Sequence, residues 1–129
     1  MTNKENELYD GTLDQIADAV HQNAVAHGFH PKDQSVADFL NYQLMNLIEE
    51  ISELHSSWRH GKFNEPCDKT HMLINVGLPV LTCAEEEYAD IVIRALDQCR
   101  RLKINISRAV AIKHMLNITR PYRHGDKLS

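Results

Sequence analysis

The chain has 129 residues, of which 43% are hydrophobic and 25% are charged, and its formal net charge at pH 7 is −4. This length and balance predict a single globular domain, residues 1–129, with a buried core. The acidic balance argues against nucleic-acid binding, because a phosphate backbone favours a basic surface. The sequence shows no long apolar run, signal peptide or Cys-x-x-Cys pair, so we expect a cytoplasmic protein without a membrane segment and with reduced thiols.

The first predicted helix spans residues 13–26, where apolar side chains recur at helical spacing. Thr12 and Gln15 have the spacing of a capping box, and Gly28 suits the end of the helix. The polar stretch before it, residues 1–11, is expected to be loose.

The second predicted helix spans residues 36–60, with Ser35 as its cap and Gly61 as its stop. Its apolar residues recur in alternating steps of four and three, the spacing of a helix-bundle seam. We expect this stripe to pack in the core, including the only tryptophan, for which stacking on a base is the alternative. The stripe consists of Leu40, Leu44, Leu47, Ile51, Leu54 and Trp58.

The third predicted helix spans residues 83–102 and begins with a second capping box, formed by Thr82 and Glu85. The connection that precedes it, residues 61–82, is long and contains apolar residues, so we expect it to pack and to include a short helical turn. The apolar stripe of this third helix consists of Ala84, Tyr88, Ile91, Ala95, Cys99 and Leu102.

A fourth helix is predicted over residues 108–119, with Ser107 as its cap and Pro121 as its end. No strand-like alternation persists anywhere in the sequence. The four helices therefore predict an all-α, four-helix bundle-like domain.

Two pairs of carboxylates lie on the predicted second and third helices, as Glu50-x-x-Glu53 and Glu87-x-x-Asp90. Each pair occupies one helical face, at the same offset from its apolar stripe. If the two helices pack antiparallel, the pairs face each other. Converging carboxylates repel one another, and a hard cation such as Mg²⁺, or Mn²⁺, removes that repulsion. The four residues are therefore predicted to be both metal ligands and catalytic groups; the alternative is an ordinary solvated acidic face.

The fourth helix carries polar residues suited to phosphate. Lys113, Asn117 and Arg120 are spaced i, i+4 and i+7, so they share one face, and Lys127 follows in a basic tail that could close over a ligand. We expect these four residues to bind substrate, with the first three facing the carboxylates. The alternative is a basic last turn that answers the helix dipole.

Histidines are concentrated near the end of the first helix, at His21, His27 and His30. They could border a pocket for a base, although surface histidines are the ordinary interpretation.

Four short segments complete the pattern, namely LIEEISEL at 47–54, WRHGK at 58–62, EEYADI at 86–91, and a tail from 113 to 127 that reads K-x-x-x-N-x-x-R-P before H-G. Over residues 41–127 the chain resembles the MazG-like all-α nucleoside triphosphate pyrophosphohydrolases. The resemblance implies a helical bundle assembled as a homodimer or homotetramer. It also implies Mg²⁺-dependent hydrolysis of a ribo- or deoxyribonucleoside triphosphate to the monophosphate and pyrophosphate.

The segment at residues 63–82 matches no motif of that family, which bears on the choice of substrate. The alternative function is a non-catalytic nucleotide-sensing or interaction module on the same fold.

Overall fold

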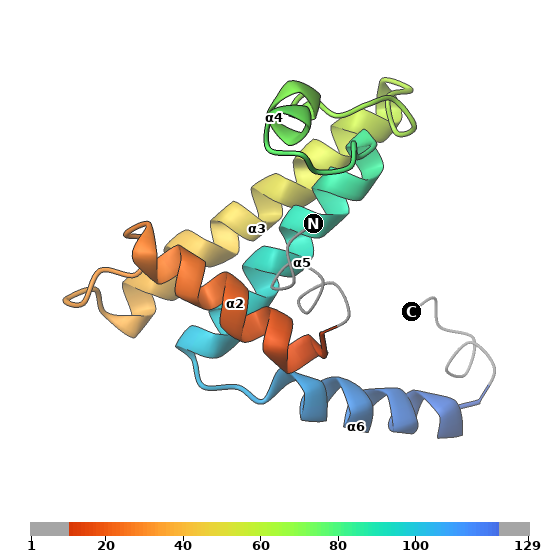
Figure 1. Ribbon diagram of the computed structural model, residues 1–129. Coiled ribbons are helices and arrows are strands. Elements are labelled where there is room, and N and C mark those ends of the chain that lie inside the picture. Colours follow the sequence, from red (N-terminus) through yellow and green to blue (C-terminus); the bar gives the residue numbers. More distant parts are fainter. Residues whose placement is uncertain (1–10, 122–129) are drawn as a thin grey trace.

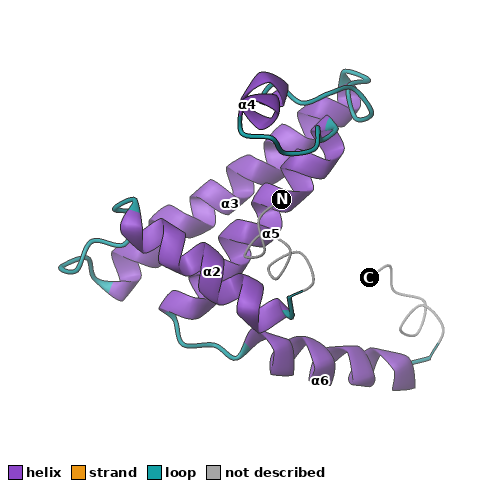
Figure 2. Cartoon of the chain, in the orientation of Figure 1, coloured by secondary structure: helices purple, strands orange, loops and turns teal. Residues whose placement is uncertain are grey.

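A computed structural model describes residues 11–121 of the chain. The described residues form five helices and no strand, and the all-α prediction is confirmed (Figures 1 and 2). None of these helices combines the length and the apolar character needed to cross a membrane. The helices are α2 (Leu13–Ala26), α3 (Val36–Arg59), α4 (Thr70–Asn75), α5 (Cys83–Arg101) and α6 (Ile106–Thr119).

The helix ends follow the predicted capping residues. The Thr12 hydroxyl accepts from the Gln15 amide at 3.3 Å, and the Gln15 side chain accepts from the Thr12 amide at 2.7 Å. Thr82 and Glu85 form the same reciprocal pair at the start of α5. Gly61 follows the C-cap of α3 at φ 67°, a left-handed conformation that glycine adopts without a steric penalty.

The start of α6 corrects a prediction, because the cap is Asn105 and not Ser107. The Asn105 side chain accepts from the Arg108 amide at 3.2 Å, so the helix begins two residues earlier than predicted, at Ile106. Asparagine is among the strongest N-caps, whereas Ser107 now lies beside Asp14 and lowers the pKa of that carboxyl.

Helices α2 and α3 both pack against α5, and α3 and α5 run antiparallel side by side (Figure 1). Helix α6 has its main helix contact with α2 and projects away from the other helices. Within one chain the fourth long helix therefore does not close a bundle. Among the described residues, the buried hydrophobic residues are Ala17, Phe39, Cys67 and Leu96.

The apolar stripe predicted for α3 is only partly covered within its own chain, since Leu40, Leu47 and Leu54 are half-buried and the other three members are exposed. Buried positions on α3 are Phe39, Gln43 and Glu50, whereas Ile51 is 50% exposed and Trp58 61% exposed. Core packing of Trp58 within the chain was therefore a wrong prediction. The reason is that the face of α3 against α5 carries polar contacts, such as the hydrogen bond from the Gln98 side chain to the Gln43 carbonyl at 3.2 Å. Part of the apolar stripe, with Leu44, Ile51 and Trp58, is left exposed.

The connection between α3 and α5 is anchored to the start of α5. The Cys67 amide donates to the Leu81 carbonyl at 2.9 Å, and the Cys83 amide donates to the Glu65 carbonyl at 2.8 Å. Helix α4 supplies the short helical element expected there. The anchoring brings Lys69, just before α4, toward the α3–α5 contact.

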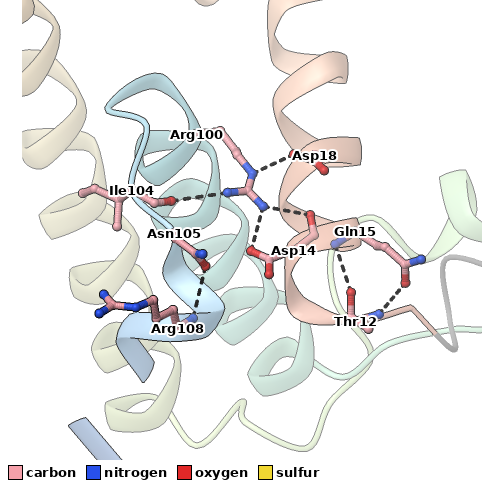
Figure 3. A network of polar contacts seen from close by, with 8 residues as sticks. All are labelled: Thr12, Asp14, Gln15, Asp18, Arg100, Ile104, Asn105 and Arg108. Atoms are coloured by element: carbon pink, nitrogen blue, oxygen red, sulfur yellow. Dashed lines mark hydrogen bonds and ion pairs between the residues drawn. The ribbon is translucent and has the colours of Figure 1, made fainter. Parts of the chain in front are cut away.

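One arginine joins three segments near the start of α6 (Figure 3). Arg100 donates to the Asp14 carboxylate at 2.8 Å and forms an ion pair with Asp18 at 2.7 Å, both on α2. It also donates to the Ile104 carbonyl at 3.3 Å, in the turn that leads to α6. In the same turn Lys103 adopts a φ of 58°, which redirects the chain. The direction of α6 is thus set by contacts with α2 and α5.

Candidate metal centre

The predicted carboxylates converge where α3 and α5 lie side by side. Glu50 and Glu53 from α3 and Glu87 from α5 each offer an oxygen, and these oxygens lie within 4.8 Å of one another. Asp90, one turn further along α5, is close enough to raise the pKa of both Glu53 and Glu87. The antiparallel arrangement expected from the sequence therefore brings Glu50, Glu53 and Glu87 together, and Asp90 lines the adjoining pocket with Glu50 and Glu53.

Two oxygens of this cluster are buried without a hydrogen-bond partner among the described residues. Glu50 is 8% exposed; one of its oxygens accepts from Arg94 Nε at 2.8 Å, and the other, Oε2, has no partner. Oε2 of Glu87 is buried and unpartnered in the same way. Burying such an oxygen costs free energy unless a donor or a cation compensates. The donor set therefore fits a hard divalent cation.

Crowding and burial raise the pKa values of the cluster. The pKa of Glu87 rises from 4.5 to about 7, mainly through burial and next through the charges of Glu53 and Glu86. Burial, followed by the charge of Glu50, also raises the pKa of Glu53 and of Asp90. Near neutral pH the metal-free site therefore holds a proton on Glu87 part of the time, and a cation would displace it.

Two cations that the sequence analysis missed border the cluster. Arg94 contacts Glu50, and its position seven residues after Glu87 on α5 is a helical spacing that could have revealed it. Lys69 forms an ion pair with the buried Glu86, and this hydrogen bond raises the pKa of Lys69 above its ordinary value. No sequence signal marked Lys69, because it lies in a segment without periodicity.

The cluster opens into a pocket of about 570 Å³ between α2, α3 and α5. Its charged lining residues include Glu50, Glu53 and Asp90 with Lys69 and Arg94, and its apolar lining residues include Val20 and Ile93. Gln43 and Asp97 also line it. This combination of charged and apolar walls suits a small molecule with an anionic part and an apolar part.

The predicted phosphate-binding residues lie elsewhere in the single chain. Lys113 and Asn117 line a separate groove of about 350 Å³ on α6, and Arg120 is the exposed C-cap of that helix. Lys127 lies outside the described residues. One chain alone therefore does not bring the α6 residues to the carboxylates.

Comparison of the chain with protein-family models, with curated proteins and with solved structures finds no match. The function therefore has to follow from the residues and their geometry.

Proposed function

We propose that this protein is a Mg²⁺-dependent nucleoside triphosphate pyrophosphohydrolase, which releases the nucleoside monophosphate and pyrophosphate. The observation that carries the proposal is the carboxylate cluster of Glu50, Glu53 and Glu87, in which buried oxygens of Glu50 and Glu87 have no hydrogen-bond partner among the described residues. Glu50 and Glu53 also line the adjoining pocket, together with Asp90. The resemblance of residues 41–127 to the MazG-like family supplies the substrate class and the reaction.

The four carboxylates, Glu50, Glu53, Glu87 and Asp90, would hold Mg²⁺, or Mn²⁺, because an all-oxygen donor set favours these ions. When bound, the ion supplies positive charge to the phosphate oxygens and makes an attacking water more acidic. Because the pKa of Glu87 is about 7 in the metal-free site, metal binding and proton release are coupled there.

Within the chain, Lys69 and Arg94 are the cations nearest to the phosphates. The Lys69 side chain is 54% exposed even while paired with Glu86, so its ammonium remains within reach of an anionic ligand. The apolar side chains that line the pocket, such as Val20 and Ile93, would give the base and sugar an apolar surface to pack against.

The active form is proposed to be a homodimer or homotetramer. Outside the polar face of Lys113 and Asn117, helix α6 exposes apolar residues, including Ile112 at 50%, Met115 at 66% and Ile118 at 69%. A broad apolar face of this kind is normally covered, and an isolated helix of 14 residues is marginal in water. The outer stripe of α3, with Ile51 and Trp58, is a surface that a second copy can cover.

In such an assembly the phosphate-binding residues act between subunits. Lys113, Asn117 and Arg120 of one copy would reach the carboxylate pocket of the other, since α6 projects away from α3 and α5, which carry the carboxylates of its own chain. This arrangement retains the predicted roles of these residues and explains why one chain separates them from the metal centre.

The test is a pyrophosphate-release panel over the common ribo- and deoxyribonucleoside triphosphates, with and without Mg²⁺. We expect release from at least one of them, only with the metal, and its loss in Glu53→Gln. Glu49→Gln is the matched control, because Glu49 is exposed on the same helix and lies outside the cluster. Nucleotide binding without release from any substrate would favour the non-catalytic sensor, and absence of binding would reject both functions.

A further inference from the structure

A second group of metal-ligating side chains lies beside the pocket, apart from the carboxylate cluster. His21 from α2, His30 from the loop after α2, and Asp97 from α5 each offer a ligand atom, and these atoms lie within 4.8 Å of one another. His21 Nδ1 is 2.7 Å from Asp97 Oδ1, and His30 Nε2 is 2.8 Å from the same oxygen. Three segments that are distant in the sequence therefore converge on one point.

Two of the three side chains are buried, whereas that of His21 is 27% exposed, and packing holds the group in place. The side chain of His30 is 2% exposed and that of Asp97 is 10% exposed. The His30 ring packs against Phe39, with centroids 5.2 Å apart, and meets His21 edge-on at 4.7 Å. The expectation of surface histidines is thus wrong for His30. His27 does not join the group, because its ring bonds to a backbone carbonyl of its own helix.

Hydrogen bonds join the three side chains. His30 Nε2 lies 2.8 Å from both oxygens of Asp97, so one N–H is shared between them, and Oδ1 is also shared with His21. The other ring nitrogen of His30 is buried without a hydrogen-bond partner among the described residues. The two imidazoles and the carboxylate therefore place their ligand atoms around one small volume, where a cation would replace the shared protons.

We propose that His21, His30 and Asp97 bind one divalent transition-metal ion of the Zn²⁺ class. Two imidazoles and a carboxylate are a common donor set for such ions, whereas the oxygen-only cluster at Glu50 and Glu53 favours Mg²⁺. Three protein ligands leave a fourth tetrahedral position open. Because Asp97 lines the pocket, that position is available to water or to a group bound there.

A metal at this point would also join α2 and the loop after it to α5, and so fix one wall of the pocket. This role does not depend on the proposed hydrolysis, because the ligands are separate from the carboxylate cluster.

The test is a Co²⁺ titration of the full chain, followed by visible absorption. Tetrahedral Co²⁺ with nitrogen ligands absorbs far more strongly than Co²⁺ held octahedrally by oxygens. We expect one strongly absorbing Co²⁺ per chain, displaced by Zn²⁺ and unaffected by excess Mg²⁺. His21→Gln and His30→Gln should each weaken binding by at least about a hundredfold, since even the loss of an outer hydrogen-bond partner costs ten- to a hundredfold. His27→Gln and Glu53→Gln are the controls and should bind Co²⁺ normally.

Absorption that excess Mg²⁺ removes, or that survives in both His21→Gln and His30→Gln, would overturn the proposal. Weak absorption alone from the wild-type protein would leave only a hydrogen-bonded triad and would also overturn it. Helical circular dichroism of each variant checks its fold. If a variant unfolds, the Mg²⁺ competition on the wild-type protein decides the question.

Discussion

Replacing Glu87 by glutamine should stabilise the metal-free protein at pH 8. The pKa of Glu87 is about 7 in the folded chain, against an ordinary value of 4.5. Because the folded value is the higher one, the favourable contribution of this group to folding is complete below pH 4.5 and is lost as the pH rises to about 7. Above that range the buried carboxylate is ionised and opposes folding, and Glu87→Gln removes its charge while keeping its shape.

The magnitude follows from the difference between the two pKa values. Moving from 4.5 to about 7 corresponds to roughly 3.4 kcal/mol if the group is fully shielded from water. The Glu87 side chain is partly exposed, and solvent screening reduces the effect, so we expect a gain of about 2 kcal/mol at pH 8. At pH 4.5 the gain should fall below about 0.5 kcal/mol, because glutamine then resembles the protonated acid.

The assay is urea unfolding followed by helical circular dichroism, in EDTA and at a fixed protein concentration. Glu49→Gln, on the exposed side of α3, should show no such dependence on pH. Added Mg²⁺ should stabilise the wild-type protein more than Glu87→Gln. If Glu87→Gln destabilises the protein at pH 8, or changes stability equally at both pH values, the carboxylates do not repel one another as the geometry requires.

Three further perturbations address phosphate binding, assembly and helix capping. Arg120→Ala should lower kcat/KM for pyrophosphate release about thirtyfold, since a lost charge-assisted hydrogen bond costs about 2 kcal/mol. Met115→Asp should place a charge in the proposed interface of α6 and yield a monomer, as measured by light scattering. Thr82→Ala should remove the capping box of α5 and lower the free energy of unfolding in urea by about 1 kcal/mol.

Each of these perturbations has its own control or contrary result. Arg108 lies on the same helix, away from the face of Arg120, so Arg108→Ala should leave kcat/KM unchanged. An equal loss of kcat/KM in Arg108→Ala would mean that the substitutions disturb the fold of α6 and not phosphate binding. Met115→Leu should keep the assembly, and an assembled Met115→Asp would place the interface elsewhere. If Thr82→Ala leaves the stability unchanged, the backbone hydrogen bonds that join residues 65 and 67 to residues 83 and 81 are sufficient to hold the start of α5.

Local signals in the sequence predicted a large part of the fold. Caps and stops such as Thr12, Thr82 and Gly61 act within a few residues, so their positions transfer directly to the structure. The proximity of Glu50 and Glu87 was also predictable from periodicity. The two carboxylate pairs lie at the same angular offset from the apolar stripes of their helices, so antiparallel packing of these helices brings the pairs face to face.

Long-range features were not predictable in the same way. Periodicity shows that a stripe such as Ile51 and Trp58 has to be covered, but it does not show whether the cover comes from the same chain or from another copy. The pairing of Lys69 with the site depends on a segment with no repeating pattern. The contact between His30 and Asp97 joins residues 67 positions apart, one of them in a loop.

Because Arg100 of α5 holds only the turn that leads into α6 against α2, a small change in the tilt of α6 at this point moves the far end of the helix by a larger distance. A helix of 14 residues is about 21 Å long, so a tilt of about 10° at its base moves its far end by about 4 Å, which is longer than a hydrogen bond. Arg120 sits at that far end, and the bonds from Arg100 to Asp14 and to the Ile104 carbonyl hold the base (Figure 3). In the proposed assembly, a substitution at Arg100 would therefore misplace a phosphate-binding side chain in a neighbouring subunit without altering any residue that touches the substrate.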